Sequence, residues 1–97
     1  MDFKELVSKM IKQLSKADKY IEKAKHCEDK ELAKIYHKMA KDKHDNFIMF
    51  HGLMEHKAKE YMGEEFSAED KMYKMMYCLM DDWATDIREE IEKLKIM

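Results

Sequence analysis

The chain has 97 residues and a formal net charge of −2, with 41% of its residues charged. This length suits one domain with a modest core, and the balanced charge argues against general binding to a phosphate backbone. Arg88 is the single arginine, so the usual bidentate reader of guanine and phosphate is scarce and we expect no nucleic-acid partner. No apolar run approaches the roughly 20 residues of a membrane span, so no membrane association is expected.

Proline is absent and only two glycines occur, which favours an all-α fold because a β-rich domain would use more turn residues. The first residues open an amphipathic helix directly and lack the apolar core of a signal peptide. A cytoplasmic location is therefore expected.

The first predicted helix covers residues 3–27. Its apolar residues recur by four and three without interruption, which is the pattern of a helix-bundle seam. A break at residues 28–30 follows, with Asp29 as the expected N-cap of the next helix. The seam consists of Phe3, Val7, Met10, Leu14, Ala17, Ile21 and Ala24, flanked by Leu6, Ile11 and Tyr20.

The second predicted helix covers residues 30–62 and ends before Gly63, a typical C-terminal stop. The third covers residues 68–96, and the segment from Ser67 to Asp70 reads as a variant capping box. The apolar stripe of the second helix contains Tyr36, Ala40, Phe47, Phe50, Met54, Ala58 and Tyr61; that of the third contains Met72, Met76, Leu79, Met80, Trp83, Ile87, Ile91 and Leu94.

Short connections make consecutive helices antiparallel, so residues 1–97 are predicted to form one up-down-up bundle. At 1.5 Å per residue the helices would be about 37 to 48 Å long. A three-helix bundle of that length is thin and leaves apolar surface exposed to solvent. We therefore expect self-association, as a homodimer or a higher oligomer, to complete the bundle.

Lys43 falls within the apolar stripe of the second helix. An unpaired buried charge is costly, so this lysine needs a partner or a route to water. Counting residues from the turns places it level with Asp86 and one turn from Asp82. We predict a buried ion pair between Lys43 and Asp86, assisted by Asp82 or Asp18; the alternative is a lysine whose stem follows the core while its ammonium reaches water.

His37, His44 and His51 are spaced by seven along one side of the second helix. Seven residues correspond to about 10.5 Å along the axis, too far for two of them to share a metal ion. One interpretation is a metal-binding or pH-sensing stripe, or one that binds another ligand, in which each histidine takes separate partners from another helix or subunit. The other is a polar edge beside the core or part of a subunit interface. We expect no metal site and no cofactor.

Cys27 and Cys78 are predicted to lie about 30 Å apart by the same matching of heights, so no disulfide is expected. The eleven methionines would form either a methionine-rich core or an adaptable binding face. Acidic residues of the third helix oppose the lysine-rich first helix, and we expect the two sets to complement one another within the bundle or between subunits.

Small-residue and tyrosine spacings recur in the first two helices: Ala-Asp-Lys-Tyr at 17–20, Ala24, Leu-Ala-Lys-Ile-Tyr at 32–36 and Met-Ala-Lys-Asp at 39–42. In these motifs about half of the chain resembles rubrerythrin-like members of the ferritin-like superfamily, including small phage-encoded versions of similar length. The third helix is similar only in length and amphipathicity. The resemblance implies a ferritin-like bundle.

That family binds two metal ions through inward carboxylates and a Glu-x-x-His pair on the second helix. Here the glutamate position falls on Lys43, the histidine position on Asn46, and the first-helix carboxylate position near Ser15 or Lys16. None of these is a carboxylate or an imidazole. The resemblance therefore implies a scaffold that has lost its di-iron site, with Lys43 as the central positive charge.

These observations predict a non-catalytic helical interaction or structural protein, phage-encoded, which associates with itself and binds a host or virion protein in the host cytoplasm or the virion. A second interpretation is an oligomeric binder of a small anionic ligand such as a nucleotide, of the anti-defence sponge type, which would use lysines and His44 or His51. A third is a residual metal-binding redox protein.

Overall fold

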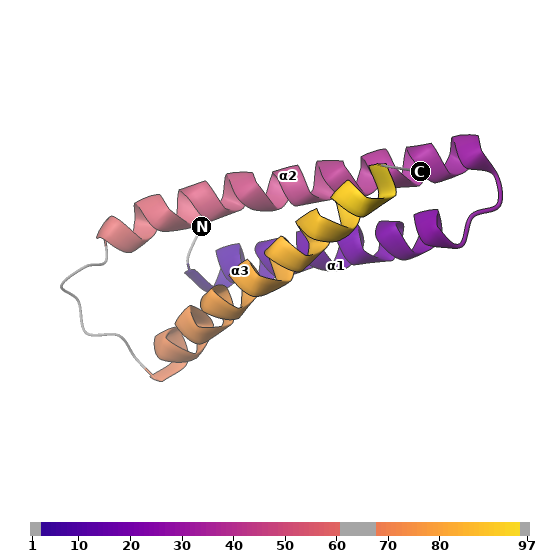
Figure 1. The fold of residues 1–97 in the computed structure, drawn as a ribbon. Coiled ribbons are helices and arrows are strands. Elements are labelled where there is room, and N and C mark those ends of the chain that lie inside the picture. Colours follow the sequence, from indigo (N-terminus) through magenta and orange to yellow (C-terminus); the bar gives the residue numbers. More distant parts are fainter. Residues whose placement is uncertain (1–2, 61–67, 96–97) are drawn as a thin grey trace.

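Three helices form one elongated bundle of 52 × 20 × 19 Å in a computed structural model (Figure 1). The structure describes residues 3–60 and 68–95, with side chains for 4–56, 75, 76 and 78–94. Helix α1 is Phe3–Lys25, α2 is Lys30–Glu60 and α3 is Ala68–Lys95. No strand occurs within these ranges. The predicted all-α, three-helix bundle is thus confirmed.

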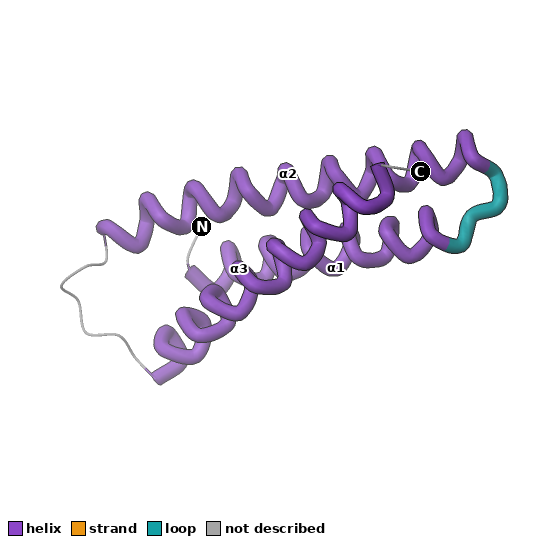
Figure 2. The backbone as a smooth tube through the Cα atoms, in the orientation of Figure 1, coloured by secondary structure: helices purple, strands orange, loops and turns teal. Residues whose placement is uncertain are grey.

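Helices α1 and α2 form an antiparallel hairpin joined by residues 26–29 (Figure 2). Helix α1 ends at Lys25, two residues before the predicted end, although the His26 amide still bonds to the Glu22 carbonyl oxygen at 3.2 Å. Cys27 lies beyond the end of α1, and its thiol donates to the main-chain oxygen of Asp29 at 3.4 Å. Lys23 and Lys25 in the last turn of α1 complement the negative end of its macrodipole.

Asp29 caps the N-terminus of α2, as the sequence predicts. Its Oδ1 accepts hydrogen bonds from the amides of Glu31 at 2.9 Å and Leu32 at 3.3 Å. The first amides of a helix lack partners within the helix, so a carboxylate in this position satisfies two of them. The cap fixes the point at which the chain reverses.

One hydrophobic core runs between the three helices. Phe47, Leu6 and Met10 are the largest side chains that are fully enclosed, and burial of each contributes about 1.5–3 kcal/mol before the entropy of ordering is subtracted. The predicted seam of α1 is confirmed wherever its side chains are described. The buried core residues are Leu6, Val7, Met10, Leu14, Ala17, Ile21, Ala24, Ala40, Phe47, Met54, Met80, Ala84, Ile87, Ile91 and Leu94.

Helix α3 crosses the hairpin obliquely and diverges from α2 towards its own N-terminal end (Figure 1). Leu79 was predicted to be a core residue, but it is 67% exposed, and Met75 is 68% exposed. The core position of that turn is taken instead by Met80, followed by Ala84. The small side chain of Ala84 lets α2 and α3 approach closely at this level.

The register of α3 against α1 is set by two polar contacts. The Trp83 indole nitrogen donates to Asp18 Oδ2 at 2.6 Å, and Lys25 Nζ lies 2.7 Å from Glu90 Oε2. Both contacts join residues 65 apart in the sequence, as expected for two parallel helices that keep one register. One lysine of α1, Lys25, therefore meets an acidic residue of α3 within the bundle.

Some predictions concern residues that the structure does not describe. These include the stop at Gly63, the capping role of Ser67, and the side chains of Tyr61 and Met72. In the described ranges, none of the three helices carries a stretch both long and apolar enough to cross a bilayer.

Candidate functional site

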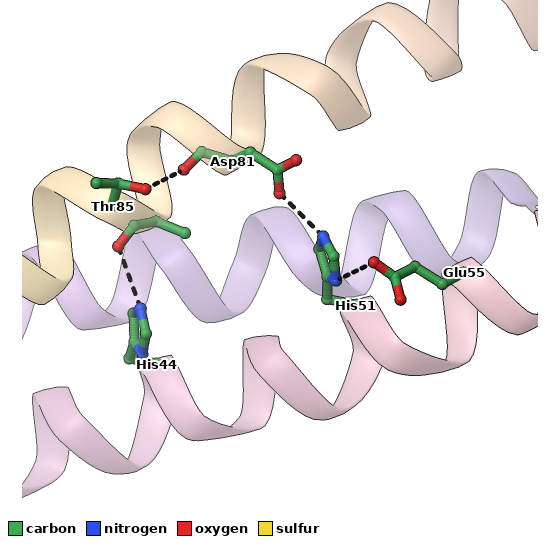
Figure 3. A network of polar contacts seen from close by, with 6 residues as sticks. His44, His51, Glu55, Asp81 and Thr85 are labelled. Atoms are coloured by element: carbon green, nitrogen blue, oxygen red, sulfur yellow. Dashed lines mark hydrogen bonds and ion pairs between the residues drawn. The ribbon is translucent and has the colours of Figure 1, made fainter.

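A row of three histidines lies between α2 and α3. His37 Nε2 donates to the main-chain oxygen of Ile91 at 2.9 Å, and His44 Nε2 donates to that of Ala84 at 3.1 Å. The third, His51, donates from Nε2 to Asp81 Oδ1 at 3.0 Å (Figure 3). Residues spaced by seven share one face of a helix, and this face is the one that α2 turns towards α3.

His44 occupies the core position that the sequence analysis gave to Lys43. Its side chain is 9% exposed, and its ring lies 6.3 Å from that of Phe47. An imidazole that carries a proton on Nε2 satisfies the carbonyl acceptor, so this buried polar side chain is hydrogen-bonded. His44 therefore joins α2 to α3 through a polar contact inside an otherwise apolar layer.

His51 has carboxylate groups near both of its ring nitrogens. Nδ1 lies 3.5 Å from Glu55 Oε1, while Nε2 faces Asp81 (Figure 3). Both ring nitrogens face carboxylate oxygens, and both can donate only when the imidazole is protonated. The Thr85 hydroxyl donates to the main-chain oxygen of Asp81 at 2.9 Å, which adds to the polar lining of this segment of α3.

A shallow groove of about 280 Å³ follows this part of the α2–α3 boundary. His44, Ile48 and His51 line it from α2, and Thr85 and Arg88 line it from α3. Pockets for small molecules usually measure about 300–1,000 Å³ and enclose most of the ligand. This groove lies just below that range, and Asp81 places a negative charge in its wall.

The predicted ion pair between Lys43 and Asp86 is not found among the described residues, and this prediction is corrected. Asp82 and Asp86 are both exposed, and Lys43 is half-buried. The matching of heights was accurate, because His44 is level with Ala84. The error lay in the rotation of α2 about its own axis, since neighbouring residues of a helix point about 100° apart. Asn46, one turn beyond Lys43, bonds to Gln13 of α1 at 3.3 Å. Lys43 therefore lies on the α1 side of α2.

Asp18 is exposed, and its partner is Trp83 rather than Lys43. The signal in the sequence was present, because a tryptophan within an apolar stripe needs an acceptor for its indole N–H. Lys25 and Glu90 form a second contact between α1 and α3. The sequence analysis expected charges of these two helices to meet but did not identify this pair. Their mutual hydrogen bond raises the pKa of Lys25 and lowers the pKa of Glu90.

A stacked aromatic pair joins α1 to α2. The rings of Tyr20 and Tyr36 lie 6.3 Å apart at an angle of 18°, and Lys23 Nζ lies 5.8 and 5.5 Å from their centroids. A lysine ammonium within about 6 Å of an aromatic face is in cation–π range. These tyrosines belong to the motifs that carry the family resemblance, and here they fasten α1 to α2.

A larger groove of about 480 Å³ lies beside the α1–α2 turn. Lys25, Glu28, Lys30, Lys34 and His37 supply its polar wall, and Ala33 and Leu94 are among its apolar lining. Cys27 also lines this groove. Both thiols are free: Cys27 is half-buried and Cys78 is exposed.

The residues at the family's metal-ligand positions do not fit a di-iron centre. Lys43 carries an ammonium, and the Asn46 amide is already bonded to Gln13. Ser15 and Lys16 on α1 are exposed. In the described part of the chain, no group of three or more His, Cys, Asp or Glu side chains is arranged to hold a metal ion.

Comparison with protein-family models, with curated proteins and with solved structures gave no match. The resemblance to rubrerythrin-like proteins therefore stays a prediction that rests on the residues quoted for it.

Proposed function

We propose that this protein is a non-catalytic helical interaction or structural protein that works through exposed apolar surfaces. One observation carries the proposal: large apolar side chains remain exposed on two of the three helices. They are Leu32, Ile35, Ile48, Met49 and Leu53 on α2, and Met75 and Leu79 on α3. Single exposed apolar residues are ordinary, whereas aligned ones mark contact surfaces.

The α3 part of this surface suits a partner of definite chemistry. Met75, Leu79, Asp82 and Asp86 recur by four, three and four, so they share one face of the helix, and all four are exposed. The face is apolar at its N-terminal end and acidic at its C-terminal end. An amphipathic helix of another protein, with apolar anchors followed by basic residues, would complement it. A host or virion protein is the class of partner proposed.

The test is a pull-down of the tagged full chain from lysate of a bacterial host, read by mass spectrometry. Leu79→Lys places a charge in the apolar end of the α3 face and should abolish capture of a specific partner. Glu89→Lys, also at an exposed position of α3, serves as the control and should retain it. Equal recovery by both variants, or capture of nothing, would count against binding through α3.

The groove beside the α1–α2 turn favours a second candidate function, the binding of a small anionic ligand. Its volume of about 480 Å³ falls in the range of small-molecule sites, and Lys25, Lys30 and Lys34 line it. Two of these lysines are partly neutralised by ion pairs, Lys25 with Glu90 and Lys34 with Glu31, and the carboxylate of Glu28 also lines the groove. This candidate therefore ranks second.

A thermal-shift screen with nucleotides would test this candidate. A rise in melting temperature with ligand concentration, lost in a Lys30→Glu variant, would support it. A melting temperature unchanged by every nucleotide would rule it out. A ferritin-like, phage-borne origin is part of the leading proposal and is supported by the quoted motifs of the first two helices.

A further inference from the structure

Exposed side chains, most of them charged, form one straight row on α1 and another on α3. In each row the members recur by steps of four and three residues, over about 27 Å of helix. This spacing keeps a row on one face of its helix, within roughly 80° of arc. The basic row consists of Glu5, Lys9, Lys12, Lys16, Lys19 and Lys23. The acidic row consists of Met75, Leu79, Asp82, Asp86, Glu89 and Lys93.

The bundle leaves most of these charges unpaired. Lys25 of α1 meets Glu90 of α3 within one chain, but both lie outside the two rows. Lys23 is in cation–π range of two tyrosine rings, and Lys93 reaches Glu90 at 3.6 Å. In the part of the chain that the structure describes, the row members that form no ion pair are Lys9, Lys12, Lys16, Lys19, Asp82, Asp86 and Glu89. A partner with the opposite pattern of charge would therefore complement either row.

The two rows complement each other when α3 of a second copy lies antiparallel to α1. Both rows have the same succession of steps, so one register pairs every member of one row with a member of the other, as the layers of an antiparallel coiled coil do. Glu5, the acidic member of the basic row, then meets Lys93, the basic member of the acidic row. The pairs of opposite charge between the two copies are Lys16–Asp82, Lys12–Asp86, Lys9–Glu89 and Glu5–Lys93.

The other end of each row also fits this register. Lys19 and Lys23 meet Leu79 and Met75 of the partner subunit, which are 67% and 68% exposed in the single copy. A lysine can lay its aliphatic stem along an apolar side chain while its ammonium stays in water. The interface thus has opposite charges along most of its length and covers two exposed apolar side chains at one end.

Other arrangements of the two rows place like charges together. In a parallel pair with the rows in step, Lys23 would face Lys93 of the partner subunit. In an antiparallel pair shifted by seven residues, either Lys12 would face Lys93 or Glu5 would face Asp86. Facing like charges is unfavourable and selects against a wrong register. The charges therefore select one orientation and one register.

We propose that the basic row on α1 binds the acidic row on α3 of a second copy of this chain, antiparallel and head to tail. The contact joins two different surfaces, so it leaves the acidic row of one copy and the basic row of the other open to further copies. The assembly therefore grows beyond a dimer into a ring or a filament. This inference rests on the proposed function, because the acidic row contains the α3 face, and it adds a second copy as a partner of that face.

The first experiment is sedimentation velocity of the full chain from roughly 10 µM to 1 mM, the range of weak complexes. Exposed ion pairs are individually weak and are screened by salt. The chain should therefore associate beyond a dimer at roughly 20 mM salt and about tenfold or more weakly at roughly 300 mM salt. A chain that stays monomeric at 1 mM and low salt would overturn the proposal, as would association that salt leaves unchanged.

The second experiment exchanges charges between the rows. Lys12→Asp with Lys16→Asp makes the basic row acidic, and Asp82→Lys with Asp86→Lys makes the acidic row basic. Either double variant should associate about tenfold or more weakly than the wild type, because two positions then face like charges. A chain that carries all four changes should regain association. Its failure to do so would overturn the pairing of the two rows.

The matched control for the basic row is Lys38→Asp with Lys41→Asp. Both lysines are exposed on α2 and lie outside the rows, so the net charge changes by the same amount at unrelated positions. This variant should associate as the wild type does, and circular dichroism checks that each variant is folded. An equal loss in the control would show that net charge, and not the basic row, governs association.

A third experiment reads the orientation. In a background with Cys27→Ser and Cys78→Ser, Lys19→Cys chains are mixed either with Leu79→Cys chains or with Glu89→Cys chains and oxidised. The antiparallel register brings position 19 beside position 79 of the partner subunit, whereas the parallel pair brings it beside position 89. Faster cross-linking of the mixture with Leu79→Cys is expected. Faster cross-linking of the mixture with Glu89→Cys would overturn the proposed orientation.

Glu89→Lys separates this inference from the proposed function. It should weaken self-association by placing a lysine opposite Lys9 of the partner subunit, while it should retain capture of a host or virion protein. A monomeric wild type that still captures such a protein through Leu79 would overturn the inference and leave the proposed function intact. A chain that self-associates as described but captures no other protein would support the inference and count against a host or virion partner.

Discussion

The imidazole of His44 donates a hydrogen bond of 3.1 Å to the main-chain oxygen of Ala84 and thereby joins α2 to α3 inside the core. A buried polar side chain is tolerated in a core when its hydrogen bond is satisfied. Here the donor is a side chain and the acceptor is the backbone of the facing helix. The polar contact described between α1 and α2 is of another kind, since it joins two side chains, Asn46 and Gln13, at 3.3 Å.

Replacing His44 with Ala should destabilise the protein by about 2–3 kcal/mol, because the change leaves a cavity and removes the hydrogen bond. Urea unfolding followed by circular dichroism measures the loss. His26→Ala is the matched control, since His26 is 79% exposed, and it should cost less than about 0.5 kcal/mol. Equal effects of the two changes would contradict the bridging role of His44.

Asp18→Ala should cost about 1 kcal/mol, because it removes the acceptor of the indole N–H of Trp83. Asp18→Asn keeps an acceptor oxygen and should cost less. Trp83 is the single tryptophan, so its fluorescence reports the local change directly. Ser15→Ala, an exposed position on the same helix, should leave both the spectrum and the stability unaltered.

Lys43→Met should leave the free energy of unfolding unchanged or raise it. Lys43 is half-buried and lies away from Asp86, so no buried carboxylate is left unpaired by its removal. Thermal unfolding at a dilute protein concentration separates this effect from self-association. Lys41→Met, at an exposed position of α2, is the comparison; a large loss specific to Lys43→Met would show that its ammonium is needed for folding.

Gly52→Ala should stabilise the protein by about 0.5–1 kcal/mol, since alanine restricts the unfolded chain and favours the helix. A Cβ at this position would meet nothing within 4 Å, so the folded state has room for it. Calorimetric melting of the two proteins measures the difference. A fall in melting temperature would reveal a requirement for glycine in α2 that lies outside the contacts described.

The contribution of the Lys25–Glu90 pair should depend on pH in a defined window. Hydrogen bonding to Lys25 lowers the pKa of Glu90 below its ordinary value of 4.5, so the contribution is full above that value and is lost as pH falls through the lowered pKa. Hydrogen bonding to Glu90 raises the pKa of Lys25 above 10.5, so the contribution is full below 10.5 and is lost as pH rises through the raised pKa.

Melting curves of Glu90→Gln and the wild type should therefore differ at pH 7 and converge in strong acid. The effect should be small and should weaken with salt. The Lys25 and Glu90 side chains are 37% and 34% exposed, and water and salt screen the attraction between charges as exposed as these. Glu89→Gln is the control on the neighbouring exposed position. A difference that persists unchanged at pH 2 would show that the ion pair is not its cause.

Hydrophobic periodicity was sufficient to predict the helices of this protein, because each one buries a continuous stripe. The start of α2 was also predictable, since Asp29 caps it as its type and position indicate. The rotation of α2 about its own axis was not predictable. Lys43 and His44 are neighbours 100° apart, and the stripe from Ala40 to Phe47 can pass through either of them.

The choice between Lys43 and His44 depends on the facing helix. Ala84 leaves space and a carbonyl acceptor opposite His44, and no local pattern in α2 encodes that. The same reasoning applies to Leu79, whose exposure follows from the oblique path of α3 (Figure 1). A polar edge beside the core was one of the two interpretations of the histidine row, and the main-chain acceptors of His37 and His44 could not be predicted because they depend on the packing of the two helices.

The acceptors of His37 and His44 belong to the peptide backbone of α3, and a backbone carbonyl recurs at every residue. A shift of α3 by one turn, about 5.4 Å, would offer each imidazole another carbonyl, so these bonds attach α3 without selecting its position. The side-chain contacts of α3 do distinguish one position from the next: Trp83 with Asp18 and Glu90 with Lys25 on α1, and Asp81 with His51 on α2. Two of these three contacts come from α1, which is not connected to α3 in the sequence. Substitutions at Asp18 or Lys25 of α1 should therefore weaken the longitudinal position of α3, although they lie far from it along the chain.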